Sequence, residues 1–234
     1  MKLAIIPARG GSKRIPQKNI KSFRGKPMIG WSILAAKESE CFDSIIVSTD
    51  NEKIAEIALN WGAEVPFLRP AELADDHTPT IPVLRHAVYE YEKLKVIKVT
   101  CGCCIYATAP FVSSESLRKG MNQLETNTHL DFSFSVTTFP HPIQRALKLN
   151  SLGLVEMLNP EYELTRSQDL VECYHDAGQF YWFRPDSLKS KNGFFTANSM
   201  PIIIPRELAQ DIDTVEDWNC AELLHRILEE RTIK

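Results

Sequence analysis

Apolar residues along the chain alternate between short continuous runs and longer segments with helical spacing. Residues 3–6 form a continuous apolar run ahead of a Gly-Gly pair, typical of a strand buried on both faces. Residues 28–37 have helical periodicity, residues 44–49 form a second strand-like run, and Asp50 and Asn51 are good capping residues for a helix over 52–60. The pattern continues with a helix over 81–94, a strand over 97–106, a helix over 114–124 and a strand over 132–137. It predicts an α/β three-layer sandwich with a mostly parallel, Rossmann-like sheet.

This alternation is interrupted between residues 139 and 174. Three prolines lie there among short apolar runs at 146–149 and 154–158, which flank an Asn-Ser pair and predict a hairpin. Strand-like runs resume at 179–183 and 200–204, and residues 215–230 have the pattern of an amphipathic helix that closes the chain. Residues 1–234 are therefore predicted to form a single domain, with 139–174 as an excursion.

Composition limits the classes of partner. The chain has 234 residues, 44% of them hydrophobic, and a net charge of −3, which gives no general attraction to nucleic acid or to an anionic membrane. No apolar run is long enough for a signal peptide or a membrane span, so we expect a cytosolic protein. The six cysteines show no spaced framework, and we expect reduced, mostly buried thiols and no zinc site.

The loop after the first strand carries the clearest chemical signal. Residues 8–19 read A-R-G-G-S-K-R-I-P-Q-K-N, with two adjacent glycines that permit a tight turn and direct backbone N–H groups at an anion. Arg9, Lys13 and Lys18 can neutralise a polyphosphate, although a solvated basic turn is the alternative. The loop matches neither the P-loop nor the dinucleotide-binding pattern. Because ligands of open parallel sheets bind beyond the carboxyl ends of the strands, this loop, the region of Asp50 and the residues after Tyr106 form the candidate site.

A pair of aspartates near the C-terminus is a candidate metal site. Asp211 and Asp213 are two residues apart, so in an extended segment both carboxylates project from one face and can share a hard cation such as Mg2+. The alternative is that Asp213 and Glu216 form a capping pair for the last helix.

Five segments in order resemble a known family. The signature I-I-P-A-R-G-G-S-K at 5–13, followed by I-P and K-N-I, is similar to that of the CMP-sialic acid synthetases, which make CMP-sugars from CTP. I-V-S-T-D at 46–50, R-P-A-E-L-A at 69–74, A-T-A-P at 107–110 and D-I-D-T at 211–214 match as well, so the resemblance covers nearly the whole chain.

The resemblance implies a nucleotide-diphosphosugar transferase fold and a set of nucleotide contacts. Arg69 and Thr80 are expected near the cytosine nucleoside, and Asp211 and Asp213 are expected to bind magnesium. The sugar's anomeric hydroxyl would attack the α-phosphorus of CTP as pyrophosphate leaves, with Lys18, Arg9 and Asp211 as the expected catalytic residues. No residue is assigned as the base that activates the sugar hydroxyl. The residues expected around the triphosphate are Ala8, Arg9, Gly10, Gly11, Ser12, Lys13, Lys18 and Asn19.

On the sugar side the chain departs from the enzymes that activate N-acetylneuraminic acid. Tyr106 replaces the glutamine that reads the acetamido group in those enzymes, and H-D-A-G at 175–178 replaces R-P-N-G. Segments 104–111, 165–169 and 174–182 resemble the pseudaminic acid branch of the family, whose substrate is a diacetamido, tetradeoxy nonulosonic acid. A substrate with more methyl groups and fewer hydroxyls suits aromatic neighbours. The expected substrate-binding residues are Tyr106, Thr108, Arg166, His175, Gln179 and Phe180.

Two of these residues have open alternatives. Arg166 is the candidate for a bidentate contact to the sugar carboxylate, and its alternative is a surface salt bridge. His175 is either a substrate contact or a packing residue. A catalytic dyad with Asp176 is not favoured because adjacent residues of a strand point to opposite faces.

Rival interpretations differ in substrate or in class. Within the class, the acceptor could be legionaminic or N-acetylneuraminic acid, and outside it the chain could be a nucleotide-binding module without catalysis. Retention of both aspartates beside Lys18 argues against the second. Residues 139–174 resemble the family's dimerisation region, which in relatives completes the neighbouring active site, so a homodimer is expected.

Overall fold

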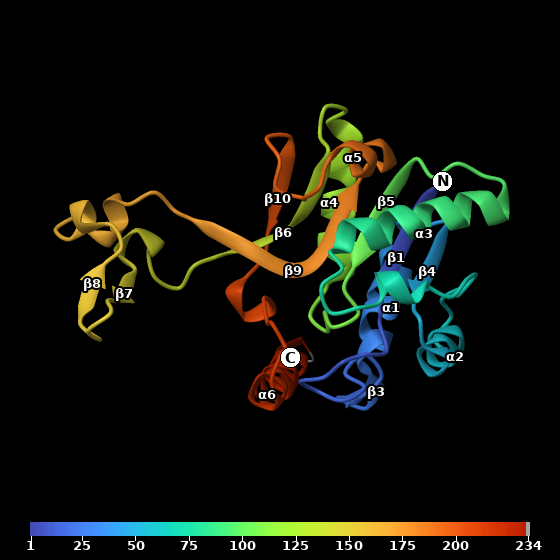
Figure 1. The fold of residues 1–234 in the computed structure, drawn as a ribbon, viewed down its shortest axis with the longest axis horizontal. Helices are drawn as coiled ribbons and strands as arrows, with labels where there is room; N and C mark the ends of the chain where they lie inside the picture. Colours follow the sequence, from blue (N-terminus) through green and yellow to red (C-terminus); the bar gives the residue numbers. More distant parts are fainter. Residues whose placement is uncertain (233–234) are drawn as a thin grey trace.

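The computed structural model describes residues 1–232 and has a six-stranded sheet at its centre, with helices on both faces (Figure 1). The strand order is β10-β6-β9-β5-β1-β4. The strands of this sheet are β1 (Lys2–Pro7), β4 (Ser44–Ser48), β5 (Cys101–Ile105), β6 (Phe132–Thr138), β9 (Tyr174–Phe183) and β10 (Ser199–Ile203).

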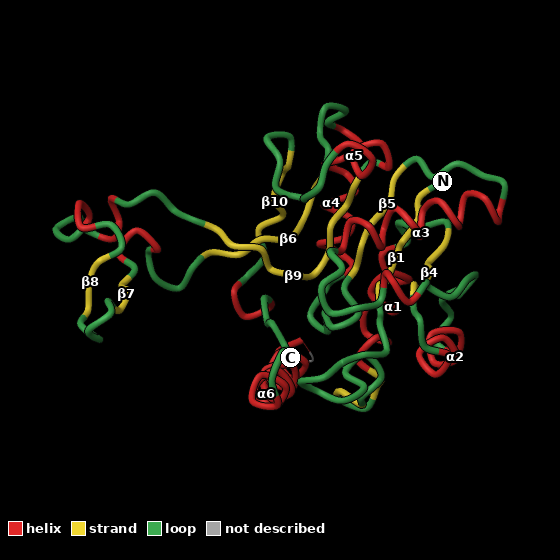
Figure 2. The backbone as a smooth tube through the Cα atoms, in the orientation of Figure 1, coloured by secondary structure: helices red, strands yellow, loops and turns green. Residues whose placement is uncertain are grey.

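Five of the six strands run in the same direction. β1 pairs in parallel with β4 and with β5, and β6 pairs in parallel with β10. β9 lies antiparallel between β5 and β6 because the chain leaves the sheet along β6, passes through the excursion and returns along β9, as the tube in Figure 2 shows. The predicted mostly parallel α/β sheet is confirmed, with β9 as the reversed strand.

The side chains of β1 show how the three layers form. Leu3 and Ile5 pack against the helix α3, whereas Ala4 and Ile6 belong to the apolar cluster that includes residues of α1 and α4. This alternation buries both faces of the strand, as its continuous apolar run predicted. The helices are α1 (Met28–Ser39), α2 (Glu52–Asn60), α3 (Thr80–Lys95), α4 (Ser114–Thr126), α5 (Pro185–Ser190) and α6 (Val215–Thr232).

A third apolar cluster attaches α6 to the basic loop. Ile15 of that loop, Phe23 of the short β2–β3 hairpin and Trp218 of α6 are buried together, and Ile212 joins them. The hairpin consists of β2 (Ser22–Phe23) and β3 (Lys26–Pro27), which the sequence did not predict. This packing brings residues 211–213 to the loop at residues 8–19.

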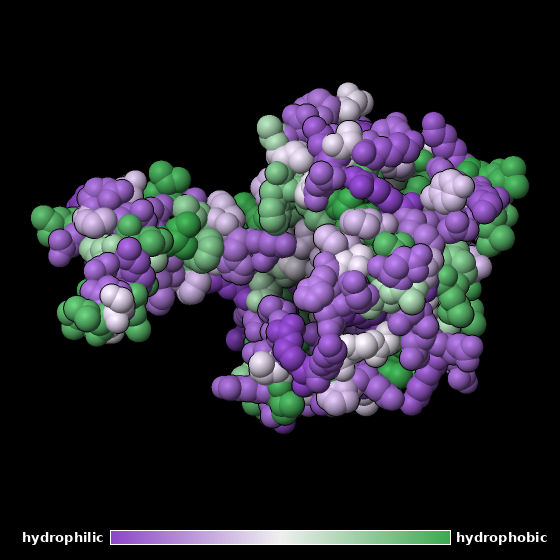
Figure 3. Space-filling view, viewed as in Figure 1, coloured by the Kyte–Doolittle hydropathy of each residue, from purple (hydrophilic) through white to green (hydrophobic). Residues whose placement is uncertain are grey.

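The excursion extends away from the body of the protein (Figure 1). Its only two strands among the described residues, β7 (Leu147–Leu149) and β8 (Val155–Met157), form the predicted hairpin. Large apolar side chains remain exposed on it, and Figure 3 shows hydrophobic residues on its surface. These exposed side chains include Leu147, Leu149, Leu152, Leu154, Val155, Leu158, Leu164 and Val171.

Some element boundaries differ from the prediction. β5 begins at Cys101 rather than at residue 97, because Val96 ends α3 in a left-handed conformation and the chain turns before joining the sheet. β9 begins five residues earlier than expected, and α5 was not predicted.

All six cysteines are free thiols, four of them buried. None of the helices in the described part of the chain combines the length and the apolar character needed to cross a bilayer.

Candidate functional site

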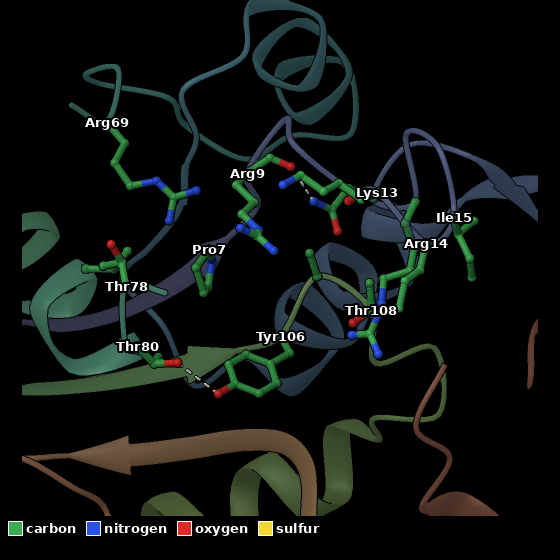
Figure 4. A pocket seen from close by; sticks show the side chains of 15 residues that line it. Pro7, Arg9, Lys13, Arg14, Ile15, Arg69, Thr78, Thr80, Tyr106 and Thr108 are labelled. Carbon is green, nitrogen blue, oxygen red and sulfur yellow. Dashed lines mark hydrogen bonds between the residues drawn. The ribbon is translucent and has the colours of Figure 1, made fainter. Parts of the chain in front are cut away.

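A cavity of about 240 Å³ lies at the carboxyl ends of β1 and β5, beside the start of α3. Figure 4 shows Arg9, Arg69 and Tyr106 directed toward it from three different segments. This is the edge of the sheet that the sequence predicted. The predicted residues that line the cavity are Arg9, Ser12, Lys13, Lys18, Asn19, Arg69, Thr80, Tyr106 and Thr108.

The basic loop is held in a tight turn by its own polar groups. The backbone N–H of Gly10 donates to Asp50 Oδ1 over 2.9 Å, and Asn19 Nδ2 donates to the carbonyl of Arg9 over 2.9 Å. A side chain at position 10 would place Cβ only 2.9 Å from Asn51 Nδ2, so a glycine is needed there, whereas Gly11 has open space around it. Ala8 is buried and its N–H donates to the carbonyl of Ser48. The loop is thus fixed against the ends of β1 and β4.

Arg69 is the most buried cation of the cavity. The residue is 6% exposed, and its Nε and one terminal nitrogen have no hydrogen-bond partner. The nearest carboxylate oxygen, Oδ1 of Asp50, lies 3.9 Å away, which is too long for a hydrogen bond. Burial lowers the pKa of the guanidinium. A buried guanidinium with unused donors that faces a cavity indicates a polar or anionic ligand.

Lys18 connects the basic loop to the paired aspartates. Its Nζ donates to the carbonyl of Ile212 over 2.7 Å and lies 3.2 Å from Asp213 Oδ1. Arg14 contacts the other oxygen of Asp213 at 2.7 Å. The pKa of Asp211 is raised, mainly by burial and also by the negative charge of Asp213. The structure therefore brings both aspartates together with Lys18.

The cap of α6 is made by other residues than the sequence suggested. Thr214 Oγ1 accepts from the N–H of Asp217, and Asp217 Oδ2 accepts from the N–H of Thr214 over 2.7 Å. This reciprocal pair is a capping box. The alternative of a cap formed by Asp213 and Glu216 is wrong, because the Asp213 carboxylate is bound by Lys18 and Arg14.

An aspartate that the sequence analysis missed binds the two cations at the front of the loop. Arg9 Nη1 lies 2.6 Å from Asp76 Oδ1 and also donates to the carbonyl of Asp75. Lys13 Nζ contacts the second carboxylate oxygen of Asp76. The hydrogen bond from Lys13 lowers the pKa of Asp76, and the contact with Arg9 adds to this effect.

Tyr106 links the cavity to β9. Its hydroxyl pairs with Thr80 Oγ1 at 2.9 Å, as the dashed line in Figure 4 marks, and its ring lies 5.4 Å from that of Tyr181. Burial raises the pKa of Tyr106 to about 12. The Tyr181 hydroxyl in turn donates to the carboxylate of Asp176. Between these two residues the pairing of β9 with β6 changes register, and Gly178 has φ 61° there. Tyr106 is therefore the sugar-side prediction that the structure places most firmly at the cavity.

Four of the predicted sugar contacts do not line this cavity. Phe180 is fully buried in the core, and its interpretation as a substrate contact does not agree with that burial. Gln179 is also buried, with Nε2 bonded to the carbonyl of Leu208 over 2.5 Å, so its side chain is structural. His175 packs on the ring of Phe139 at 4.8 Å, and its Nδ1 bonds the carbonyl of Asp176.

Arg166 lies on the excursion. It makes the surface ion pair that was its alternative, with Nε 2.8 Å from Asp169 Oδ2 and a side chain that is 71% exposed. Within one chain it does not reach the cavity. Its contact to a sugar carboxylate stays a prediction that requires a second chain.

Some residues that contribute to the site were not assigned from the sequence, and the sequence patterns that could have revealed them differ. Arg14 stands inside the quoted basic loop, so its position was visible although no role was assigned to it. The T-x-x-D spacing of Thr214 and Asp217 is a capping pattern that could have been found. Asp76 gave no local signal, since its partners are 67 and 63 residues away along the chain.

Comparison with known proteins agrees with this geometry. The family model described as "Cytidylyltransferase" matches residues 3–226. A pseudaminic acid cytidylyltransferase of Campylobacter jejuni is 40% identical over 96% of this chain and 96% of its own length. A CMP-N,N'-diacetyllegionaminic acid synthase of Legionella pneumophila is 28% identical over 99% of both chains.

A solved structure shares the fold. CMP:2-keto-3-deoxy-manno-octonic acid synthetase complexed with CTP superposes with a TM-score of 0.69 at 14% identity, over 96% of this chain and 98% of that one. The family match over nearly the whole chain, the 40% identical relative and the cation-lined cavity at the strand ends lead to one conclusion. This chain belongs to the cytidylyltransferase family and is a nucleotidyltransferase.

Proposed function

We propose that the protein transfers CMP from CTP to pseudaminic acid, giving CMP-pseudaminic acid and pyrophosphate. The observation that carries the nucleotide part is Arg69, whose buried, unpaired N–H groups face a cavity that also holds Arg9 and Lys18. A ligand with several negative charges and polar acceptors would satisfy these donors. The choice of sugar is supported by the 40% identical relative, whose name specifies pseudaminic acid.

The basic loop would hold the triphosphate. Its fixed turn presents the side chains of Arg9, Ser12 and Lys13 at the carboxyl end of β1. Arg69, whose backbone is bonded to Thr49 after β4, and Thr80, at the start of α3, line the same cavity and would contact the nucleoside. A loop whose backbone is fixed before the nucleotide binds avoids the cost of ordering that backbone.

In the reaction, the anomeric hydroxyl oxygen of the sugar would form a bond to the α-phosphorus of CTP while the bond to pyrophosphate breaks. The hydroxyl proton is transferred to a base, and we assign no residue to that role. Negative charge that develops on the phosphate would be stabilised by Lys18, which is fixed by the carbonyl of Ile212, and by Arg9. Catalysis would then consist of positioning and electrostatic stabilisation.

We propose that Asp211 and Asp213 would hold a magnesium ion, for which Arg14 or Lys18 would release an oxygen of Asp213. Mg2+ usually takes one or two carboxylates and completes its coordination with water and phosphate oxygens, so a third protein ligand is not required. Burial and, after it, the negative charge of Asp213 raise the pKa of Asp211, and a cation shared by the two carboxylates would relieve their repulsion. Bound there, the ion would neutralise charge on the phosphates and on the departing pyrophosphate.

We also propose that the protein acts as a homodimer. The excursion exposes a group of large apolar side chains, with Leu164 93% exposed, and gathered apolar side chains on a surface mark interaction sites. A second copy of the chain would cover them and would bring Arg166 of each chain toward the cavity of the other. Tyr106 and Thr108 would supply the contacts from the chain's own cavity.

Because all six thiols are free, we expect the protein to act in the cytosol.

The test is the release of pyrophosphate from CTP with a panel of nonulosonic acids. We expect turnover with pseudaminic acid and much slower turnover with N-acetylneuraminic and legionaminic acids. The legionaminic acid synthase at 28% identity makes that sugar the second candidate. Turnover with N-acetylneuraminic acid alone would contradict the proposed specificity, and CTP binding without turnover of any nonulosonic acid would favour the non-catalytic nucleotide-binding module.

A further inference from the structure

Asp76 occupies the cations that the proposed triphosphate needs. Each oxygen of its carboxylate is taken by a different cation, Oδ1 by Arg9 at 2.6 Å and Oδ2 by Lys13. Both cations come from the basic loop and both line the cavity. A carboxylate that bridges an arginine and a lysine in this way uses the same donors that would bind phosphate oxygens.

The loop around Asp76 is shaped by its neighbour Asp75. Oδ1 of Asp75 accepts from the N–H groups of His77 and Thr78, at 2.9 and 2.6 Å, and from the hydroxyl of Thr78. These bonds fold residues 75–78 into a turn of the type that aspartate commonly forms with its own backbone. Asp75 is therefore occupied within the turn, whereas the Asp76 side chain is directed to Arg9 and Lys13.

This turn is part of the wall of the nucleotide cavity. Thr78 lines the cavity, and Thr80, two residues later, begins α3 and pairs with Tyr106. The carbonyl of Asp75 also accepts from Arg9 Nη1 over 2.6 Å. Asp76 itself does not line the cavity, but its carboxylate is bound by Arg9 and Lys13, two cations that do.

A triphosphate bound to the N–H groups of Arg9 and Lys13 that now face Asp76 would lie close to its carboxylate, and two negative groups repel each other at short range. We propose that Asp76 is an intramolecular competitor of the triphosphate, whose carboxylate must leave Arg9 and Lys13 when the nucleotide binds. Since the product would lose the β- and γ-phosphates, Asp76 would regain these cations after the reaction and favour release of the product. The nucleotide named here rests on the proposed function, but the competition with a polyphosphate does not.

The proposal predicts a gain of affinity, which damage to the fold does not produce. Asp76→Asn keeps the size of the side chain and removes its charge. We expect it to bind inorganic tripolyphosphate and CTP about three- to tenfold more tightly, because two partly exposed ion pairs no longer have to be broken. Cytidine, which has no phosphate, is expected to bind equally to both proteins.

The measurement is titration calorimetry of the full chain at low ionic strength with these three ligands. Asp76→Glu, which retains the charge, is expected to return the affinity for tripolyphosphate toward the wild-type value. The matched control is Asp186→Asn, which removes an equally charged partner of Lys189 on α5 and is expected to leave all three affinities unchanged. The gain in Asp76→Asn is expected to shrink as salt is added, since screening weakens the pairs that it removes.

Equal or weaker binding of tripolyphosphate to Asp76→Asn would overturn the proposal, and so would an equal gain for cytidine. If Asp76→Asn has a lowered thermal midpoint, Asp76→Ser replaces it in the same titrations and the same outcomes apply. Inorganic tripolyphosphate separates this inference from the proposed function. Suppose that Asp76→Asn binds tripolyphosphate more tightly than the wild type, but that the wild type does not turn over CTP. The role of Asp76 as a competitor would then stand, whereas the proposed cytidylyltransferase activity would be rejected.

Discussion

The nucleotide cavity and the excursion differ in how much of their binding chemistry a single chain brings together. In the cavity, Arg69 is 6% exposed and Lys18 is fixed by the carbonyl of Ile212. On the excursion, Arg166 is held only by Asp169 among the contacts that the structure describes, and Leu164 is 93% exposed. A single chain thus brings the cations predicted to bind CTP (the donor side) together in one cavity, whereas Arg166, the residue predicted to bind the sugar carboxylate (the acceptor side), lies outside that cavity.

The difference follows from the secondary structure that supports each region. Cavity residues follow strands buried on both faces, so the core determines where their loops begin. The excursion contains two strands of three residues each, and a two-stranded hairpin has little stability without packing. A second copy of the chain would provide that packing, so changes in the two regions should have different consequences.

Lys18→Ala is expected to have the largest effect, because it removes a cation of the donor side that no partner can replace. Turnover should fall about 10²- to 10³-fold, as for the loss of other groups that stabilise transition-state charge. Pyrophosphate release measures the rate, and circular dichroism and thermal unfolding check that the fold is retained.

The control for this variant is Lys119→Ala, which removes an exposed lysine on α4 that pairs with Glu115 and lies outside the cavity. It should keep full activity. If Lys18→Ala were as active as Lys119→Ala, Lys18 would have no part in the reaction and the comparison would lose its main support.

Arg166→Ala addresses the acceptor side. If Arg166 of one chain binds the sugar carboxylate at the cavity of the other, its loss should raise the KM for the sugar about ten- to hundredfold and leave the Kd for CTP unchanged. Steady-state kinetics with the sugar and calorimetry with CTP separate the two quantities. Arg145→Ala, on the same excursion, is the matched control and should change neither. A wild-type KM in Arg166→Ala would leave the ion pair with Asp169 as the only role of Arg166.

The same contrast explains how much could be read from the sequence. The basic loop and the edge of the sheet were predictable because buried strands and adjacent glycines are local patterns. Phe180 was misinterpreted since its neighbours in the sequence resembled a sugar site, whereas strand pairing places its side chain in the core. The reversed direction of β9 depends on where the excursion returns to the sheet, which no local pattern specifies.

Ion pairs across the fold were the least predictable part. Asp76 meets Arg9 only because the turn before α3 lies beside the loop after β1. Asp213 was assigned two alternatives from its spacing, and the observation that removes the capping alternative is the pair formed by Thr214 and Asp217. A single sequence lists both residues of such a pair, but it does not show that they lie close together in the folded chain.

Asp213→Asn tests whether the aspartates on the donor side bind magnesium. We expect the Mg2+ concentration for half-maximal rate to rise at least about tenfold, because one of two carboxylate ligands is lost. The activity is measured in a magnesium titration. Arg14→Ala is the control, since it removes a partner of Asp213 but keeps the carboxylate, and it should not raise that concentration. An unchanged requirement in Asp213→Asn would reject Asp213 as a metal ligand.

Thr214→Ala is expected to have the smallest effect, because it removes the cap of α6 and leaves the residues of the cavity in place. Loss of the reciprocal bond with Asp217 should lower the thermal midpoint by about 2–4 °C. The magnesium requirement should stay unchanged, since Ile212 and Trp218 still anchor the segment in the apolar cluster with Ile15. Differential scanning calorimetry and the magnesium titration measure the two quantities on the same preparation. A shift in the magnesium requirement as large as that of Asp213→Asn would mean that the helix cap, rather than the apolar cluster, positions the aspartates beside Lys18.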